Sequence, residues 1–180
     1  MININDLIEE FENNHESKGM VEDCKILYRY AIENQYKNIL ELGILHANST
    51  KVFALAAFQI PNCRFTSLDI EQYCIDEAKQ RLQVYGLESF ANFVNLDSVK
   101  FLETQPDGSY DCIFIDTNHE LKQSLAELFL SALKSNKHIF LHDTSMPGVM
   151  KSIETLRKFE PQYEIMNFPT PSGLGLVIKK

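Results

Sequence analysis

The chain has 180 residues, of which 44% are hydrophobic and 23% charged, as expected for one globular domain. No apolar run approaches the ~18 residues of a membrane span, and the first residues lack the basic and apolar regions of a signal peptide. We therefore expect a cytoplasmic protein with no membrane partner. The net charge of -8, without a basic stripe, argues against nucleic acid as a partner. The four cysteines form no CxxC pair, so they do not indicate a zinc or thioredoxin-type site.

The first 35 residues have the pattern of two helices. The first has an apolar face that includes Leu7 and Phe11, and we expect Asn5 or Asp6 to cap its N-terminus. A second apolar stripe at helical spacing follows after a polar stretch. We assign residues 1–35 to an N-terminal helical segment that packs on the core.

From residue 38 onward, short apolar runs alternate with stretches of helical spacing. The runs have strand length and nearly continuous hydrophobicity, typical of strands covered on both faces: Ile39–Leu42, Phe65–Leu68, Phe93–Leu96, Cys112–Ile115 and Ile139–Leu141. Two further runs at the end of the chain, Tyr163–Phe168 and Leu174–Ile178, flank a turn rich in proline and predict an antiparallel pair.

This alternation predicts an α/β fold, specifically a doubly wound, mostly parallel seven-stranded sheet. Helices are expected on both faces of the sheet, and an antiparallel strand pair is expected at its C-terminal end. We assign residues 36–180 to this Rossmann-like unit, which together with the N-terminal helices forms a single domain.

Ligands of open parallel sheets bind beyond the carboxyl ends of the strands. The segment Asn38–Thr50 predicts a strand, a tight turn and a helix start, and Gly43 allows the backbone to approach a ligand closely. Asn48, Ser49 or Thr50 can cap the helix, whose N-terminus favours an anionic group. An ordinary strand-to-helix turn with a capping residue would explain the same pattern.

The next two strands also end in polar residues. Asp69, about 26 positions beyond Gly43, can accept hydrogen bonds from both hydroxyls of a ribose. Asp97 and Ser98 can meet the edge of an adenine. A helix N-cap is the alternative interpretation at both places.

The acidic and histidine residues that follow strands four and five indicate what chemistry the site could perform. Asp116 and His119 follow one of these strands, and His142 and Asp143 follow the other. Carboxylate oxygens suit a divalent cation such as Mg²⁺, and a histidine three residues past Asp116 can serve as a general base. The alternative is that both acids cap helices and His119 is a solvated residue of a first helical turn.

These motifs resemble those of class I S-adenosylmethionine-dependent methyltransferases. The closest resemblance is to the small bacterial branch near the metal-dependent and macrolide sugar O-methyltransferases, and it extends from about Lys25 to Lys180. It implies that the cofactor S-adenosylmethionine binds to Glu41, Gly43, Ala47, Ser49, Thr50, Asp69, Asp97, Ser98 and Asp116.

The resemblance also implies roles for the four residues that follow strands four and five. We call these residues the rim: Asp116, His119, His142 and Asp143. Asp116 and Asp143 would hold the metal, and Asp116 and His119 would be catalytic, with His119 as the base. His142 stands where some metal-binding relatives carry an acid, so it is a further candidate ligand, although imidazole suits softer ions than Mg²⁺. The implied reaction is methyl transfer to a hydroxyl of a small-molecule acceptor, such as a sugar, and relatives often form homodimers.

Ala47 departs from the family pattern, because this position usually holds a second glycine. Alanine fits here if its φ is negative. The substitution motivates a second hypothesis, a domain that binds the cofactor or a partner without catalysis. A nicotinamide-dependent oxidoreductase would need a GxGxxG fingerprint, and no glycine lies between Gly43 and Gly86.

Overall fold

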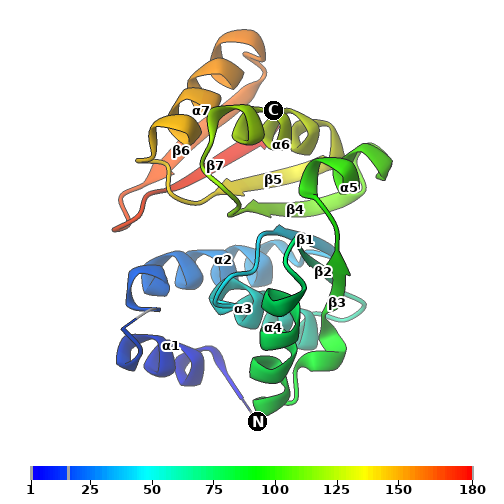
Figure 1. Cartoon of the computed structure of the whole chain (residues 1–180), viewed down its shortest axis with the longest axis vertical. Helices are drawn as coiled ribbons and strands as arrows, with labels where there is room; N and C mark the ends of the chain where they lie inside the picture. The colour runs from blue at the N-terminus through cyan, green and yellow to red at the C-terminus, as the bar shows by residue number, and fades with distance from the viewer. Residues whose placement is uncertain (1, 16, 180) are drawn as a thin grey trace.

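A computed structural model describes residues 2–15 and 17–179 (Figure 1). Within them, seven strands form one sheet in the order β3-β2-β1-β4-β5-β7-β6. The strands are β1 (Asn38–Leu42), β2 (Arg64–Asp69), β3 (Asn92–Asn95), β4 (Tyr110–Ile115), β5 (Ser135–Leu141), β6 (Tyr163–Phe168) and β7 (Leu174–Lys179). Strands β1 to β5 pair in parallel, and β7 is antiparallel to both β5 and β6. The predicted fold class is confirmed.

The helices lie on both faces of this sheet (Figure 1). They are α1 (Ile4–Asn13), α2 (Val21–Asn34), α3 (Asn48–Gln59), α4 (Gln72–Val84), α5 (Ser98–Thr104), α6 (Leu121–Lys134) and α7 (Pro147–Phe159), with short 3₁₀ turns η1 (Lys18–Met20) and η2 (Glu88–Phe90). One apolar core forms between the sheet and α1 to α3, and a second forms against α5 to α7.

Alternation along each strand decides which core a side chain joins. In β1, Ile39 belongs to the core on the α3 face, whereas Leu40 and Leu42 belong to the core on the α6 face. Because successive side chains point to opposite faces, Glu41 lies on the α3 face, together with Ile39. The strand order reverses between β1 and β4, and this switch point is where an open α/β sheet binds its ligand.

Two predicted helix caps are wrong. The N-cap of α1 is Asn3, whose side chain accepts from the N–H of Asn5, and the Asp6 carboxylate accepts from the backbone N–H of Asn3. The reciprocal pair is a capping box, which moves the helix start two residues earlier than an Asn5 cap would. The N-cap of α3 is Ala47, and no side chain caps this helix.

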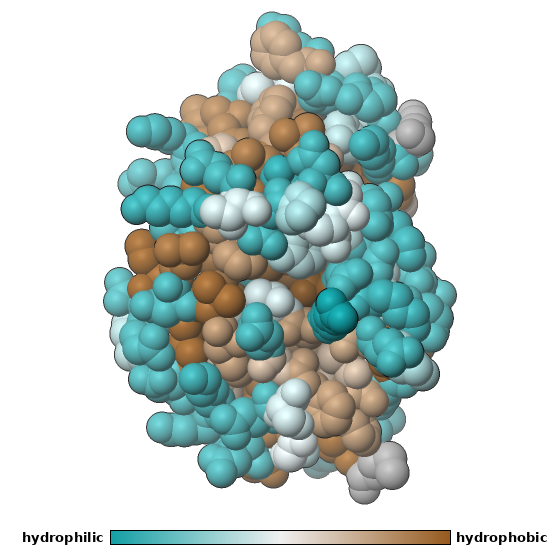
Figure 2. Space-filling model, turned by 90° about the vertical axis from the view of Figure 1, so that its right-hand side faces the viewer, coloured by the Kyte–Doolittle hydropathy of each residue, from teal (hydrophilic) through white to brown (hydrophobic). Residues whose placement is uncertain are grey.

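The N-terminal helices pack on α3. Leu7, Phe11 and Leu27 are fully buried in the core of that face. Lys51 of α3, also buried, forms an ion pair with Glu10 of α1 at 2.7 Å, and its ammonium group lies over the ring of Phe11. None of the helices in the described part of the chain is both long and apolar enough to cross a membrane. Figure 2 shows that polar side chains surround apolar ones on one face of the molecule.

Candidate functional site

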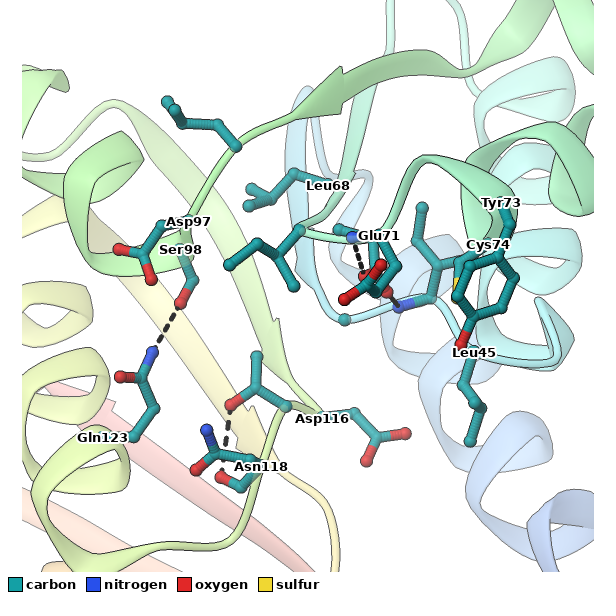
Figure 3. Close-up of a pocket in the computed structure, with 16 residues that line it drawn as sticks. Leu45, Leu68, Glu71, Tyr73, Cys74, Asp97, Ser98, Asp116, Asn118 and Gln123 are labelled. Carbon is teal, nitrogen blue, oxygen red and sulfur yellow. Dashed lines mark hydrogen bonds between the residues drawn. The ribbon is translucent and has the colours of Figure 1, made fainter.

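A cleft of about 320 Å³ opens at the carboxyl ends of the central strands. Among its lining residues are five that the sequence pattern singles out, Gly43, Asp69, Asp97, Ser98 and Asp116. Figure 3 labels Asp97, Ser98 and Asp116 among the side chains around the cleft. The five residues lie at the ends of β1, β2, β3 and β4, so the parallel sheet brings together residues far apart in the chain.

Gly43 occupies a position that only glycine fits. Its φ is +91°, and a Cβ atom there would lie 2.0 Å from the carbonyl oxygen of Asp116. Its N–H donates to Leu68, and the N–H of Asp116 donates to Leu42. The turn after β1 is therefore tied to the ends of both neighbouring strands, which fixes one wall of the cleft.

Asp69 is held by the backbone. One carboxylate oxygen accepts from the N–H of Ile44 at 2.9 Å, and the other accepts from the N–H of Glu71 at 2.8 Å. Each carboxylate oxygen can accept more than one hydrogen bond. Asp69 can therefore still accept from a ligand hydroxyl in the cleft.

Asp97 and Ser98 both line the cleft, and Asp97 is also a helix N-cap. Asp97 caps α5 by accepting from the N–H of Lys100 at 3.0 Å, and it also lines the cleft. Ser98 lines the cleft as well, and its hydroxyl donates to the buried carboxylate of Glu127 on α6. Burial raises the pKa of Glu127, and hydrogen bonds from neighbouring side chains offset only part of that rise.

Glu41, Ser49 and Thr50 lie behind the cleft and do not line it. Glu41 is fully buried and accepts from the hydroxyls of Thr50 and Ser67 at 2.7 and 2.5 Å. Burial raises the pKa of Glu41 to about 7. These residues hold β1, β2 and α3 together beneath the cleft.

Ala47 adopts the backbone conformation that the sequence argument disfavours. Its φ is +55°, in the left-handed region, and its side chain is fully buried. The condition under which alanine would fit without strain is therefore not met, because the residue directly before α3 is left-handed. An L-residue in this region costs roughly 1–2 kcal/mol.

The rim residues converge. Asp116, His119, His142 and Asp143 each offer a ligand atom, and these atoms all lie within 4.8 Å of one another. The Nδ1 atom of His142 lies 3.1 Å from Asp116 and 3.3 Å from Asp143, and Nε2 of His119 lies 3.1 Å from Asp143. Neither Asp116 nor Asp143 caps a helix, so that alternative is wrong.

A further acid, Asp23 of α2, contacts the same cluster. It is fully buried, and its carboxylate lies 3.2 Å from Nε2 of His142. Burial by itself would lower the pKa of His142, but Asp116, Asp143 and Asp23 together raise it to about 12. The hydrogen bond from His142 lowers the pKa of Asp143. The cluster therefore favours a positive charge between these carboxylates.

Comparison with known proteins identifies the family. A family model described as a methyltransferase domain matches residues 40–144, which is more than half of the chain. The chain belongs to this methyltransferase family. The matched segment runs from β1 to the loop after β5, so it contains the cleft and the rim.

Solved structures share the fold of this methyltransferase. An O-methyltransferase from Bacillus cereus in complex with SAH is 18% identical, with a TM-score of 0.76 over 97% of this chain and 91% of the other. TomG from Streptomyces achromogenes, an O-methyltransferase in complex with SAM, is 18% identical, with a TM-score of 0.72 over 89% and 80%. SAH-bound PaMTH1 from Podospora anserina is 16% identical, with a TM-score of 0.74 over 98% and 87%. No curated protein matches the chain.

The rim of the methyltransferase fits a single metal ion. Its four ligand atoms are close enough to share one ion, and Asp23 stands behind His142 as carboxylates stand behind metal-binding imidazoles. With the imidazole of His142 among the ligands, the set suits a borderline ion such as Zn²⁺ or Mn²⁺ better than Mg²⁺. An ion would have to displace the proton that the acids stabilise on His142, so its affinity would rise with pH.

Sequence reasoning missed several residues of the methyltransferase site. Three of them lie on helices and belong to no strand-end motif: Asp23, Gln123 and Glu127. In these helices the sequence pattern shows only the apolar stripe that packs on the sheet. Tyr73 and Cys74 line the cleft from the first turn of α4. Only the packing of helices on the sheet brings these side chains to the site.

Proposed function

We propose that the protein transfers the methyl group of S-adenosylmethionine to a hydroxyl oxygen of a small-molecule acceptor. The position of Asp116 carries this proposal, because its carboxylate lines the cleft and also lies 3.1 Å from His142 in the rim. A cofactor in the cleft would therefore end beside the groups that can activate an acceptor. The cofactor complexes of the B. cereus protein and TomG, which share this fold, support the choice of cofactor.

The cleft supplies contacts for each part of the cofactor. Asp69 would accept hydrogen bonds from the ribose hydroxyls, and Asp97 and Ser98 would lie beside the adenine. Gly43 lets the backbone approach the sulfur-bearing part, where a side chain would collide with Asp116. The turn itself would be held in place from beneath the cleft by Glu41, Ser49 and Thr50.

His119 is the proposed general base. The Nε2 atom of His119 lies 3.1 Å from Asp143, so a proton on Nε2 would face that carboxylate and leave the lone pair on Nδ1 for the acceptor hydroxyl. As the acceptor oxygen forms its bond to the methyl carbon, the sulfur–carbon bond breaks and the hydroxyl proton passes to His119. The products are a methyl ether and S-adenosylhomocysteine, and the cationic sulfonium becomes a neutral thioether.

The metal is a further part of the proposal. Asp116, Asp143 and His142 would hold it, and a bound divalent ion would lower the pKa of the acceptor hydroxyl. Without an ion, the proton on His142 supplies the positive charge beside Asp116. The acceptor class that we would test first is a sugar hydroxyl, with catechols as the comparison.

Transfer of a labelled methyl group to a panel of sugars and catechols tests the function. We expect labelled product with the wild-type protein and a loss of about 100-fold or more in turnover for His119→Ala. His15→Ala is the matched control and should keep full turnover. Added EDTA, Asp116→Ala and Asp143→Ala test the metal, because any divalent-cation dependence must disappear in both variants.

Binding without catalysis is the second candidate, and the left-handed Ala47 favours it, because this strained residue stands in the turn whose residues Gly43 and Ile44 line the cleft. Tight binding of S-adenosylhomocysteine with no labelled product from any acceptor would support this candidate and contradict the first.

A further inference from the structure

One buried acid lies against the rim but has no part in the proposed reaction. Asp23, in the first turn of α2, is fully buried. It belongs to the N-terminal helices, outside the residues 40–144 that the family model matches. Among the described residues, neither of its carboxylate oxygens has a hydrogen-bond partner. Because an unpartnered carboxylate is costly to bury, its position calls for an explanation.

Asp23 faces one nitrogen of His142. The Nε2 atom of His142 lies 3.2 Å from the Asp23 carboxylate, and this nitrogen also lacks a hydrogen-bond partner among the described residues. The ring is itself buried. Two unpartnered polar atoms at this distance satisfy each other when a proton lies between them, and an ionised carboxylate has none to give. The proton therefore has to come from Nε2 of His142.

The other nitrogen of the same ring faces the rim acids. Nδ1 of His142 lies 3.1 Å from Asp116 and 3.3 Å from Asp143. The ligand atoms of the four rim residues all lie within 4.8 Å of one another, and Asp23 is not part of that group. An ion shared by Asp116 and Asp143 would therefore meet Nδ1 of His142, while Asp23 stands on the far side of the ring.

A carboxylate behind an imidazole decides which ring nitrogen binds a metal. When one nitrogen donates its proton to the carboxylate, the other keeps its lone pair for the ion. The same contact fixes the orientation of the ring and makes the ligand nitrogen more basic. Burial strengthens the contact between Asp23 and His142, because the local dielectric is low and water does not compete.

We propose that Asp23 is a positioning residue that holds a proton on Nε2 of His142, so that Nδ1 binds a divalent ion together with Asp116 and Asp143. One imidazole nitrogen among carboxylate oxygens favours borderline ions such as Co²⁺ and Zn²⁺ over Mg²⁺. The inference rests on the metal part of the proposed function. It makes α2 part of the metal site, although α2 supplies no ligand.

Nitrogen chemical shifts test the tautomer of His142 in the wild-type protein. The histidines are isotopically labelled, Zn²⁺ is added in excess, and proton–nitrogen correlation spectra distinguish a protonated ring nitrogen from a metal-bound one. His142→Gln identifies the signals of His142 by their loss. We expect Nε2 to carry the proton and Nδ1 to bind the ion. The opposite tautomer, with Nε2 on the ion, overturns the inference and leaves a metal site in place.

Titration with Co²⁺, followed by its visible absorption, measures the contribution of Asp23. The spectrum of Co²⁺ changes when an imidazole nitrogen replaces a water oxygen, so it reports His142 as a ligand. We expect Asp23→Leu to weaken Co²⁺ binding by roughly 10- to 100-fold, the usual effect of removing such a carboxylate. Asp23→Asn should lose less, because its amide oxygen can still accept from Nε2. Glu22→Leu, at the exposed neighbouring position on α2, is the matched control and should bind Co²⁺ as the wild-type protein does.

The outcomes are distinguishable. Wild-type affinity for Co²⁺ in Asp23→Leu, or tighter binding of Mg²⁺ than of Co²⁺ by the wild-type protein, overturns the inference. If the wild-type protein binds neither Co²⁺ nor Zn²⁺, the metal part of the proposed function fails with it, and methyl transfer without a metal is untouched. Asp23 does not line the cleft, so Asp23→Leu should keep its affinity for S-adenosylhomocysteine. If that variant fails to fold, the tautomer of the wild-type protein still decides.

Discussion

Glu41 makes the stability of the protein depend on pH. Its pKa is about 7 in the folded protein because the side chain is fully buried, against an ordinary value of 4.5. Between these two values the folded chain keeps a proton that the unfolded chain has lost, so stability falls as the pH rises through this window and is constant above it. We expect Glu41→Gln to remove this loss, which is on the order of 3 kcal/mol.

Urea unfolding at pH 5 and pH 8 measures the effect. The wild-type protein and the exposed control Glu33→Gln should both lose stability between the two values, and Glu41→Gln should lose less. An equal loss in all three proteins would show that Glu41 does not titrate in this range.

The strand-end motif predicts Glu41 as a cofactor contact, and the structure places it beneath the cleft. Strand alternation explains the difference, because a side chain between Leu40 and Leu42 must face α3. Gly43 follows β1 and Asp69 ends β2, and both line the cleft, as expected for residues at the carboxyl ends of parallel strands. Asp23 and Gln123 have no comparable signal in the sequence.

At the scale of elements, the turn after β1 depends on Gly43. In Gly43→Ala the new Cβ would lie 2.0 Å from the carbonyl oxygen of Asp116, so β1 and β4 would have to separate. Gly86→Ala is the matched control, since its φ of +67° is also positive but nothing lies within 4 Å of the added atom. We expect Gly43→Ala to destabilise the protein by roughly 1–3 kcal/mol more than Gly86→Ala does.

Thermal and urea unfolding of the two variants give this difference directly. Equal losses of stability in the two variants would contradict this prediction. They would mean that the turn after β1 accommodates a Cβ atom and that the positive φ alone causes the destabilisation.

Strands and helices could be predicted because their apolar periods differ. Runs such as Cys112–Ile115 are buried on both faces and therefore lack alternation, whereas α6 carries a clear apolar stripe. Helix starts were less predictable, since Asn3 and Ala47 act as N-caps and only one of them is a typical capping residue. The left-handed turn at Ala47 follows from the geometry of β1 and α3, which the local sequence does not reveal.

At the scale of the whole molecule, the rim is assembled from distant parts of the chain. Asp23 comes from α2, Asp116 and His119 follow β4, and His142 and Asp143 follow β5. The parallel sheet makes the convergence of the strand ends predictable. The approach of Asp23 depends on how α2 packs on the sheet, which no motif in the sequence indicates.

The central claim is that the cleft binds S-adenosylmethionine through Asp69, and titration with S-adenosylhomocysteine tests it most directly. We predict binding by the wild-type protein, weaker binding by about tenfold or more in Asp69→Asn, which loses one carboxylate acceptor for the ribose hydroxyls, and unchanged binding in the control Asp76→Asn on α4. Absence of binding at millimolar ligand, or equal affinity in Asp69→Asn and the wild-type protein, would contradict the account.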